Sequence, residues 1–357
     1  MYVKSLHLKN FRNYDEQSLT FDEKTNVFQG NNAQGKTNLL EALYLFSMGK
    51  SFRTHTDTEL IRFGEDYLKA ELLFCDKNRE HTLEIIVLKE RKKQIKINGV
   101  TISRLSELMG HLNVVLFYPE ELGLVKEGPG VRRRFMDVAI SQLRPGYYHT
   151  LGRYHRVLDQ RNKLIKKIKL SGSDALVDTL SVWNEQLVSY GIELMGYRQE
   201  FMKRLGILAE KAHFEASGEK LTLDYKPWFE TKEAFLEKLA SGLPRELEQG
   251  YTLYGPHRED FGIYINGAEA KVFGSQGQQR SAVVSLKLAQ ADLLFEEYGE
   301  YPVLLLDDIM SELDQNRRAY LAGKIPGKQV FITCTELDSA LPEGKLFTVS
   351  KGRAVLQ

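Results

Sequence analysis

Alternation of apolar and polar residues is the main pattern in the first third of the chain. It predicts strands over residues 2–8, 68–75, 82–88 and 94–97, because side chains along a strand point to opposite faces in turn. The short run 26–29 indicates a further strand, and residues 38–46 have the spacing of an amphipathic helix. The pattern therefore predicts strands gathered around one early helix.

The period changes in the middle of the chain. Residues 119–249 follow mostly helical spacing, with the longest periodic stretch over 176–213. No heptad is sustained, so a compact helical lobe is predicted rather than a coiled coil. Strands return from residue 251, with Asn266-Gly267 as a hairpin turn. A long helix over 282–295 and buried strands over 302–306 and 329–333 complete the prediction.

Composition sets bounds on the class of protein. A chain of 357 residues with 42% hydrophobic content can bury a large core and form two lobes. Its two cysteines, Cys75 and Cys334, are too few for a disulfide framework and suit a reducing compartment. There is no apolar run of about 18 residues, so no membrane span is expected. A cytoplasmic location is predicted.

A glycine-bounded loop joins the predicted strand 26–29 to the helix after it. Backbone N–H groups of such a loop surround phosphate oxygens, and the helix N-terminus adds partial positive charge. Lys36 is expected to reach the β- and γ-phosphates and the Thr37 hydroxyl to bind Mg²⁺. A chance glycine-rich turn rarely has this setting, so a nucleoside triphosphate site is predicted. The loop fits G-x-x-x-x-G-K-[ST] and reads Gly30-Asn31-Asn32-Ala33-Gln34-Gly35-Lys36-Thr37.

Two adjacent carboxylates follow the apolar run 302–306. A buried parallel strand would place Asp307 and Asp308 at its C-terminal end, where α/β sheets bind ligands. Asp307 is expected to hold Mg²⁺, and Asp308 to orient or deprotonate the attacking water. The alternative is that the two aspartates are a solvated pair in a turn. The presence of a P-loop in the same chain makes that interpretation weaker.

Positive charge is concentrated in one segment. Residues 131–170 contain eleven Lys and Arg against two Asp, a net charge of +9, whereas the whole chain carries only +1. Within it, Arg153, Arg156, Lys163 and Lys167 recur at helical spacing and form one stripe. A stripe this dense repels itself unless it meets phosphate, so DNA contact is predicted, with Arg132 and Arg133 as further candidates. An ordinary solvated face is the alternative.

Motifs in the last third of the chain narrow the class of nucleotide-binding protein. Phe273-Gly274-Ser275-Gln276-Gly277-Gln278-Gln279-Arg280-Ser281 precedes the helix 282–295 and resembles the signature motif of ABC-type ATPases, although Gln276 stands between Ser275 and Gly277. Ser311-Glu312-Leu313-Asp314 follows the paired acids at the spacing of the ABC D-loop. The order of P-loop, signature, paired acids and D-loop makes the resemblance specific.

The whole chain resembles the RecF family of SMC-like ABC ATPases, which lack a long coiled coil. The segments that carry this resemblance are Leu6-His7-Leu8-Lys9-Asn10-Phe11-Arg12-Asn13-Tyr14, Lys50-Ser51-Phe52-Arg53-Thr54, Phe117-Tyr118-Pro119-Glu120-Glu121-Leu122, Gly128-Pro129 with Arg132-Arg133-Arg134-Phe135, and Gly255-Pro256-His257-Arg258. The resemblance implies an α/β ABC-type ATPase head, with antiparallel N-terminal strands and a P-loop sheet, in residues 1–118 and 250–357. A helical lobe, basic in its first part, would be inserted as residues 119–249.

The resemblance also implies a function. It predicts an ATP-binding protein of recombinational repair that forms a homodimer with ATP, binds DNA at gaps or single-strand/duplex junctions, and helps load recombinase with a RecR-like mediator protein. Such a protein would be associated with the nucleoid. Ser275, Gly277, Gln278 and Asp314 would contact the nucleotide bound by the second subunit. Arg53 lies where SMC-like heads carry an arginine that reaches the phosphates; a DNA contact or a surface charge is the alternative.

The chain departs from the ABC pattern at three places. Asp308 stands where a glutamate is usual, which implies slow ATP hydrolysis by Lys36 and Asp308. Glu120 stands near the usual coupling glutamine. Thr333-Cys334-Thr335 stands where many ABC ATPases place a switch histidine; His257 is the nearest candidate for that role, and a structural histidine beside Arg258 is the alternative. An ATP-dependent protein-assembly module with an acidic protein partner and no DNA contact is the alternative function. A small-molecule kinase is weaker, because kinases need neither a signature motif nor a D-loop.

Overall fold

The computed structural model describes residues 1–337 and 343–357, which divide into two compact units. The first unit comprises Met1–Leu122, Leu208–Glu219 and Ser275–Gln357, and the second comprises Gly123–Ile207 and Lys220–Gly274. This division differs from the sequence-based boundaries at three places. Residues 250–274 belong to the second unit, whereas residues 119–122 and the end of the longest helix belong to the first.

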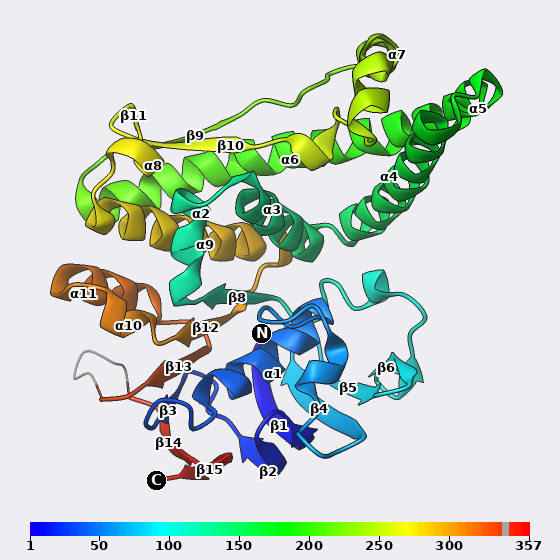
Figure 1. Ribbon diagram of the computed structural model, residues 1–357. Coiled ribbons are helices and arrows are strands. Elements are labelled where there is room, and N and C mark those ends of the chain that lie inside the picture. The colour runs from blue at the N-terminus through cyan, green and yellow to red at the C-terminus, as the bar shows by residue number, and fades with distance from the viewer. Residues whose placement is uncertain (338–342) are drawn as a thin grey trace. The chain divides into compact units, whose positions relative to one another are not determined.

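The first unit contains two six-stranded sheets. One is antiparallel, with the order β2-β1-β4-β5-β6-β7, and the other has the order β15-β14-β3-β13-β12-β8, in which only β15 runs antiparallel to its neighbour. In Figure 1, β14 and β15, the last two strands of the chain, lie at one edge of the second sheet. The strands are β1 Tyr2–Phe11, β2 Tyr14–Thr20, β3 Thr25–Gln29, β4 Tyr67–Cys75, β5 Glu80–Leu88, β6 Arg91–Ile97, β7 Val100–Thr101, β8 Val114–Phe117, β12 Val303–Asp307, β13 Val330–Cys334, β14 Lys345–Ser350 and β15 Arg353–Leu356.

Burial follows the sequence pattern that predicted these strands. Along β4, buried and partly exposed residues alternate, as expected for a sheet with one solvated face. All of β12 and β13 is buried, as expected for central parallel strands. Helix α1 contacts both sheets, which explains why eleven of its thirteen residues are buried. The remaining helices of this unit are η1 Asp57–Leu60, η2 Leu105–Glu107, η3 Pro119–Leu122, α9 Gln276–Tyr298, α10 Ile309–Glu312 and α11 Gln315–Lys324, with α1 at Lys36–Met48.

The second unit is mainly helical. Phe135 of α3 lies 6.3 Å from Phe201 of α6 and 6.4 Å from Phe261 of β10 between ring centres, so these elements share one core. The elements are α2 Gly123–Lys126, α3 Pro129–Leu143, α4 Pro145–Ser171, α5 Asp174–Asp178, α6 Leu180–Ser217, β9 Leu221–Tyr225, α7 Lys232–Gln249, η4 Pro256–Arg258, β10 Phe261–Ile265, β11 Ala268–Glu269 and α8 Ala270–Phe273. Across the described ranges, no helix has the length and apolarity needed to span a bilayer.

One part of the predicted helical region is not helical. Leu221–Tyr225 forms β9, which pairs with β10 in a three-stranded sheet, so the helical prediction is wrong at these residues. The hairpin prediction is confirmed, because Asn266 and Gly267 join β10 to β11 with φ of 50° and 82°. A positive φ at both central residues is what the Asn-Gly turn supplies.

Candidate nucleotide site and nucleic-acid surface

The P-loop connects β3 to α1, as predicted. Gly30 needs to be glycine because a Cβ there would lie 2.2 Å from the carbonyl oxygen of Val349. Gly35 has a φ of 116°, which side chains disfavour, and it begins the helix. Lys36 is buried, and its Nζ donates to the carbonyl oxygens of Gly30 and Asn31 at 2.7 and 3.3 Å. Its ammonium is therefore held against the loop's backbone, where phosphate binds in this motif.

Three groups hold the loop from outside. Asn13 donates from Nδ2 to the Gln34 carbonyl oxygen at 2.9 Å, and the Gly352 N–H donates to the same oxygen at 3.1 Å. The buried Tyr14 hydroxyl donates to the Gly35 carbonyl oxygen at 3.1 Å. The turn between β1 and β2 and the turn between β14 and β15 thus meet at the P-loop. None of these three contacts was foreseen from the sequence, because each joins residues far apart in the chain.

Thr37 and Asp307 have the spacing of two ligands on one cation. The Thr37 hydroxyl donates to Asp307 Oδ1 at 2.9 Å. Two oxygens at right angles about an octahedral Mg²⁺, each at about 2.1 Å, would be about 3.0 Å apart. Burial raises the pKa of Asp307, while hydrogen bonds from Thr333 and Thr37 oppose that shift. A divalent cation would favour the charged carboxylate, so the residues fit Mg²⁺.

Asp308 begins α10 in the left-handed region, with φ 48° and ψ 14°. Its backbone N–H donates to the Thr333 hydroxyl at 2.9 Å, and that hydroxyl donates to Asp307 Oδ1 at 2.8 Å. Thr333 therefore fixes both acids from the next strand. Thr333 was noted in the sequence only as part of the switch-histidine region. This contact gives it a structural role beside the dyad.

Arg53 lies beside the first turns of α1. Its Nη1 donates to Asn38 Oδ1 at 2.8 Å and lies 3.6 Å from Glu41 Oε2. The guanidinium is close enough to Asp307 to oppose the rise in that carboxyl's pKa that burial causes. The structure therefore brings Arg53 together with the P-loop, Asp307 and Asp308 in one cluster.

The signature residues form a second cluster at helix N-termini. Ser275 caps α9: its hydroxyl accepts from the Gln278 N–H at 3.2 Å, and Gln278 Oε1 accepts from the Ser275 N–H at 2.8 Å. Asp314 caps α11 in the same way, by accepting from the Arg317 N–H at 2.9 Å. Ser275 and Asp314 are both exposed. Among the residues that the structure describes, no hydrogen bond or ion pair joins Ser275, Gln278 or Asp314 to the P-loop cluster, although the Ser311 hydroxyl of the D-loop donates to the Asp308 carbonyl oxygen at 2.7 Å.

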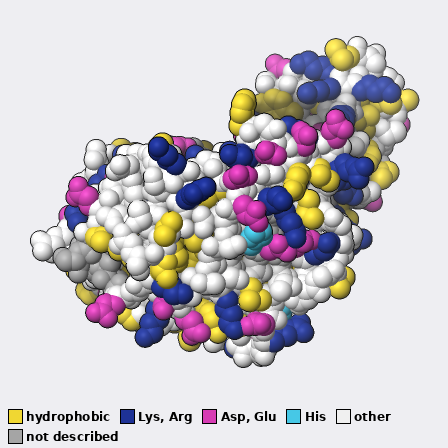
Figure 2. Space-filling model, turned by 90° about the horizontal axis from the view of Figure 1, so that it is seen from below, with side chains coloured by type: hydrophobic (Ala, Val, Ile, Leu, Met, Phe, Trp, Pro, Cys, Tyr) yellow, Lys and Arg dark blue, Asp and Glu magenta, His cyan; other side chains and the backbone are white. Residues whose placement is uncertain are grey.

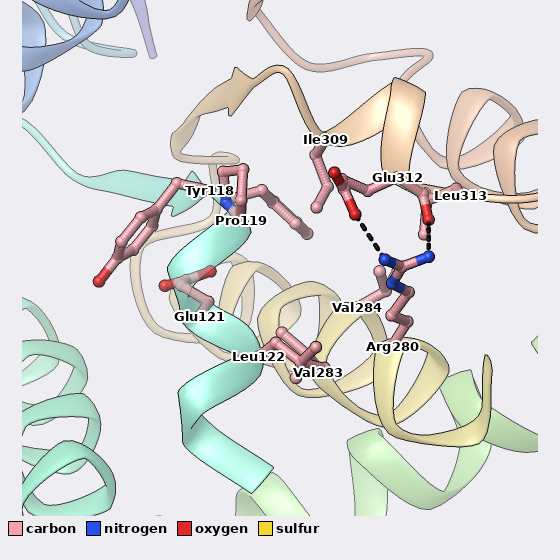
Figure 3. A pocket seen from close by; sticks show the side chains of 11 residues that line it. Tyr118, Pro119, Glu121, Leu122, Arg280, Val283, Val284, Ile309, Glu312 and Leu313 are labelled. Atoms are coloured by element: carbon pink, nitrogen blue, oxygen red, sulfur yellow. Dashed lines mark hydrogen bonds and ion pairs between the residues drawn. The ribbon is translucent and has the colours of Figure 1, made fainter. Parts of the chain in front are cut away.

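Two arginines cross-link the signature helix to the D-loop. Arg317 of α11 donates from Nε to the Ser281 hydroxyl at 2.5 Å and also pairs with Asp314. Arg280 of α9 donates to the carbonyl oxygen and carboxylate of Glu312 at 2.6 and 2.5 Å, as Figure 3 shows. The signature helix and D-loop are therefore held as one piece. Neither of these contacts was predicted from the sequence.

A small cavity of about 40 Å³ lies beside this cross-link, between the segment after β8, helix α9 and α10. Tyr118, Pro119 and Leu122 line one side of it (Figure 3). Glu121 also lines this cavity: its side chain is 14% exposed and pairs with Lys287 of α9 at 2.6 Å, and burial raises the pKa of Glu121. Glu121, rather than the exposed Glu120, thus links the segment after β8, where ABC heads usually have the coupling glutamine, to the signature helix α9. The available signal was a lysine within the mainly apolar stretch 282–289 of that helix.

His257 has a structural setting in the second unit. Its Nδ1 is 2.6 Å from the Tyr154 hydroxyl, and its Nε2 is 3.2 Å from the Thr252 carbonyl oxygen. Burial lowers its pKa to about 4. Both ring nitrogens are therefore engaged within this unit.

The basic stripe lies on α4. Arg153, Arg156, Lys163 and Lys167 are exposed, while Tyr154, Leu158, Ile165 and Ile168 on another stripe of the helix are buried. Lys163 pairs with Asp159 at 2.7 Å, so its charge is partly neutralised. On the main body of the face drawn in Figure 2, Lys and Arg side chains lie scattered among Asp and Glu.

Two predicted DNA contacts have internal partners instead. Arg132 is buried and makes a two-contact ion pair with Asp260, at 2.7 and 2.8 Å. Arg133 is half-buried and donates to the Glu259 carbonyl oxygen at 2.7 Å. Their guanidinium groups are used within the second unit, so neither is retained as a candidate phosphate contact. Arg161 is likewise fully buried and pairs with Glu246.

The sheet order, P-loop, paired acids, signature cap and D-loop define an SMC-type ABC ATPase head, which confirms the predicted fold class. The model of the RecF/RecN/SMC N terminal domain matches residues 2–352. The DNA replication and repair protein RecF of Clostridium tetani (strain Massachusetts / E88) is 42% identical over 99% of this chain and 100% of its own length. The chain belongs to the RecF family.

Further relatives agree. The RecF protein of Bacillus pumilus (strain SAFR-032) is 41% identical over 99% of this chain and 100% of its own length. A solved structure of the recombination mediator protein RecF-ATP in the RecFOR pathway is 39% identical, with a TM-score of 0.93 over 100% of this chain and 97% of that one. An Smc head bound to the C-winged helix domain of ScpA shares the fold, at 15% identity and a TM-score of 0.59, covering 100% of this chain and 97% of that one.

Proposed function

We propose that this chain is an ATP-dependent DNA-binding protein of recombinational repair. The observation that carries the proposal is the division of site residues into two clusters within one chain. The P-loop cluster has the groups for phosphate and Mg²⁺, and the signature cluster presents exposed caps with no hydrogen bond to it among the described residues. Each cluster is half of a site, and a second copy supplies the missing half.

ATP with Mg²⁺ is the proposed ligand. The backbone of residues 30–37 surrounds the phosphates, and Lys36 and Arg53 carry the positive charge. Thr37 and Asp307 hold the cation. In a head-to-tail homodimer, Ser275, Gly277, Gln278 and Asp314 complete the nucleotide site of the second subunit. The bound ATP named for the 39%-identical RecF structure supports this choice of nucleotide.

DNA is the proposed partner of the stripe on α4. Phosphate contacts by Arg153, Arg156, Lys163 and Lys167 would give binding without base readout. The preferred DNA is a gap or a single-strand/duplex junction, where the protein promotes recombinase loading with a RecR-like mediator. The RecFOR pathway named for the solved relative supports this placement. The protein acts in the cytoplasm, at the nucleoid.

Hydrolysis is proposed to be slow and to release the dimer. Asp308 is one methylene shorter than the usual glutamate, so its carboxylate lies farther from the attacking water, and misplacement of a base costs rate. The lifetime of the ATP-bound state then matters more than turnover.

DNA affinity measured with and without ATP, across salt concentrations, tests this function. ATP should strengthen binding, and affinity should fall steeply with salt because counterions are released. The Ser275→Arg variant should still bind ATP as a monomer but lose the ATP-induced dimer. The alternative is an ATP-dependent protein-assembly module with an acidic protein partner. DNA binding that is absent with and without ATP would favour that alternative.

A further inference from the structure

Asn13 lies in the short turn between β1 and β2, yet its side chain contacts the nucleotide loop. Its amide Nδ2 donates to the Gln34 carbonyl oxygen at 2.9 Å, and its Oδ1 accepts from Asn38 Nδ2 at 2.8 Å. One amide thus bonds to the P-loop and to the first turn of α1 together. If the Asn13 amide were turned over, its oxygen would face the Gln34 carbonyl oxygen and its NH2 group would face the NH2 group of Asn38. Both hydrogen bonds therefore fix the same orientation of the amide.

The position of Asn13 is itself tightly set. A Cβ on Gly35 would come within 2.8 Å of both amide atoms of Asn13, so the loop packs directly on this side chain. The Gly352 N–H donates to the same Gln34 oxygen, and a Cβ on Gly352 would lie 2.2 Å from the Asn13 carbonyl oxygen. The turn, the P-loop and the C-terminal hairpin therefore meet in van der Waals contact.

A chain of polar contacts continues from Asn13 to Arg53. Asn38 donates to Asn13 and accepts from Arg53 Nη1 at 2.8 Å. Arg53 in turn lies 3.6 Å from Glu41, a fully buried carboxylate. Arg12, the neighbour of Asn13 in the turn, fixes Glu41 with two contacts of 2.8 and 2.7 Å. The turn therefore holds both groups against which the Arg53 guanidinium rests.

We propose that Asn13 is a positioning residue of the ATP site, which sets the place of Arg53 relative to the P-loop. The long Arg53 side chain is exposed. If it were free before ATP binds, fixing it on binding would cost conformational entropy and weaken the affinity for ATP. The Asn13 amide ties that guanidinium to the loop that binds the phosphates. This inference rests on the proposed role of Arg53 at the phosphates and names the residue through which that role is set.

A double-mutant cycle tests the proposal, with affinity for a slowly hydrolysed ATP analogue and Mg²⁺ measured by calorimetry. Asn13→Ala should weaken binding about tenfold in the unmodified protein, which corresponds to about 1.4 kcal/mol. In the Arg53→Ala background, the same change should weaken binding less than threefold, because the group that Asn13 positions is already absent. A purely structural role of Asn13 would give equal losses in both backgrounds.

Controls keep the outcomes distinct. Ser18→Ala, on the adjacent strand β2, removes a contact with His7 and should leave analogue affinity unchanged. If Asn13→Ala does not fold, Asn13→Ser provides a side chain that suits turns but is too short to bridge. Equal losses in both backgrounds, or no loss in the unmodified protein, would overturn the role of Asn13 and leave the proposed function standing. If Arg53→Ala alone leaves affinity unchanged, the phosphate role of Arg53 fails instead.

Discussion

At the scale of single residues, the backbone of Asp308 makes one substitution especially informative. Its left-handed conformation suits Asn as well as Asp, so Asp308→Asn removes charge with little added strain. We expect ATP binding and dimer formation to persist. Hydrolysis should fall by about 100-fold or more, because a general base is lost.

Single-turnover hydrolysis of bound ATP measures that loss. A rate equal to that of the unmodified protein would remove Asp308 from the catalytic role. Glu120 and Glu312 would then be the next candidates. Glu120 is exposed, whereas Glu312 would first have to release Arg280, with which it pairs at 2.5 Å.

His257 makes the stability of the second unit depend on pH. Burial lowers its pKa to about 4, so the folded state holds the neutral ring. In the unfolded chain, the ring takes up a proton at a pKa of about 6.5. Its contribution to stability is therefore fully present above pH 6.5 and is lost as pH falls toward 4.

The His257→Gln variant tests that dependence, because it cannot titrate in this range. Urea unfolding at pH 7 and pH 5 should show a smaller acid-induced loss of stability in the variant than in the unmodified protein. Equal losses in the two proteins would contradict the assigned cause. The carboxylates and the other histidines contribute equally to the pH dependence of stability in both proteins, so their contributions cancel in the comparison.

At the scale of elements, the N-terminus of α9 has two separable roles. Ser275 caps the helix, and replacing a capping residue by alanine costs about 1 kcal/mol. Asp is an equally good cap, so Ser275→Asp should keep the unmodified melting temperature. Its negative charge would face the partner's phosphates, so the ATP-induced dimer should be lost.

Thermal melts and sedimentation, run on the same samples, separate these roles. A Ser275→Asp protein that still dimerises with ATP would show that this helix end does not face the partner's nucleotide. The Ser275→Ala variant is the matched control, since it loses the cap without adding charge.

The exposed stripe of α4 gives a prediction about DNA. Arg156→Glu with Lys167→Glu should weaken binding similarly for all sequences and flatten the salt dependence by about one unit per lost phosphate contact. Lys226→Glu is the control, because Lys226 is 84% exposed but lies outside α4. Filter binding over a range of salt concentrations measures both quantities. An unchanged affinity and slope in the double variant would place the DNA elsewhere.

The hydrophobic periodicity and the motifs of the sequence predicted the helices and strands better than they predicted the contacts between them. Apolar and polar residues alternate over residues 68–72, and the structure places residues 68–75 in a strand with one extra residue, Tyr67–Cys75, along which burial alternates throughout. The short run at 221–225 lies within the region predicted to be mostly helical, and pairing with β10 makes it a strand. The internal role of Arg132 depends on Asp260, 128 positions away, and no local pattern encodes that pair.

At the scale of the whole molecule, the motif order identified the P-loop and signature groups because each motif is contiguous. The contacts that arrange them are not contiguous. Asn13 meets Gln34, and Arg280 meets Glu312, only after the chain has folded. The sequence therefore predicts which residues form the site, while the side chains that position them emerge from the structure.

Sedimentation velocity with Mg²⁺, with and without ATP, tests the central claim most directly. The account predicts a monomer without nucleotide and a dimer with ATP. Lys36→Ala should remain monomeric because it binds ATP weakly, and Ser275→Arg should remain monomeric although it binds ATP. A dimer that forms equally with and without ATP, or that persists in Ser275→Arg, would contradict the claim that two copies complete each other's nucleotide sites.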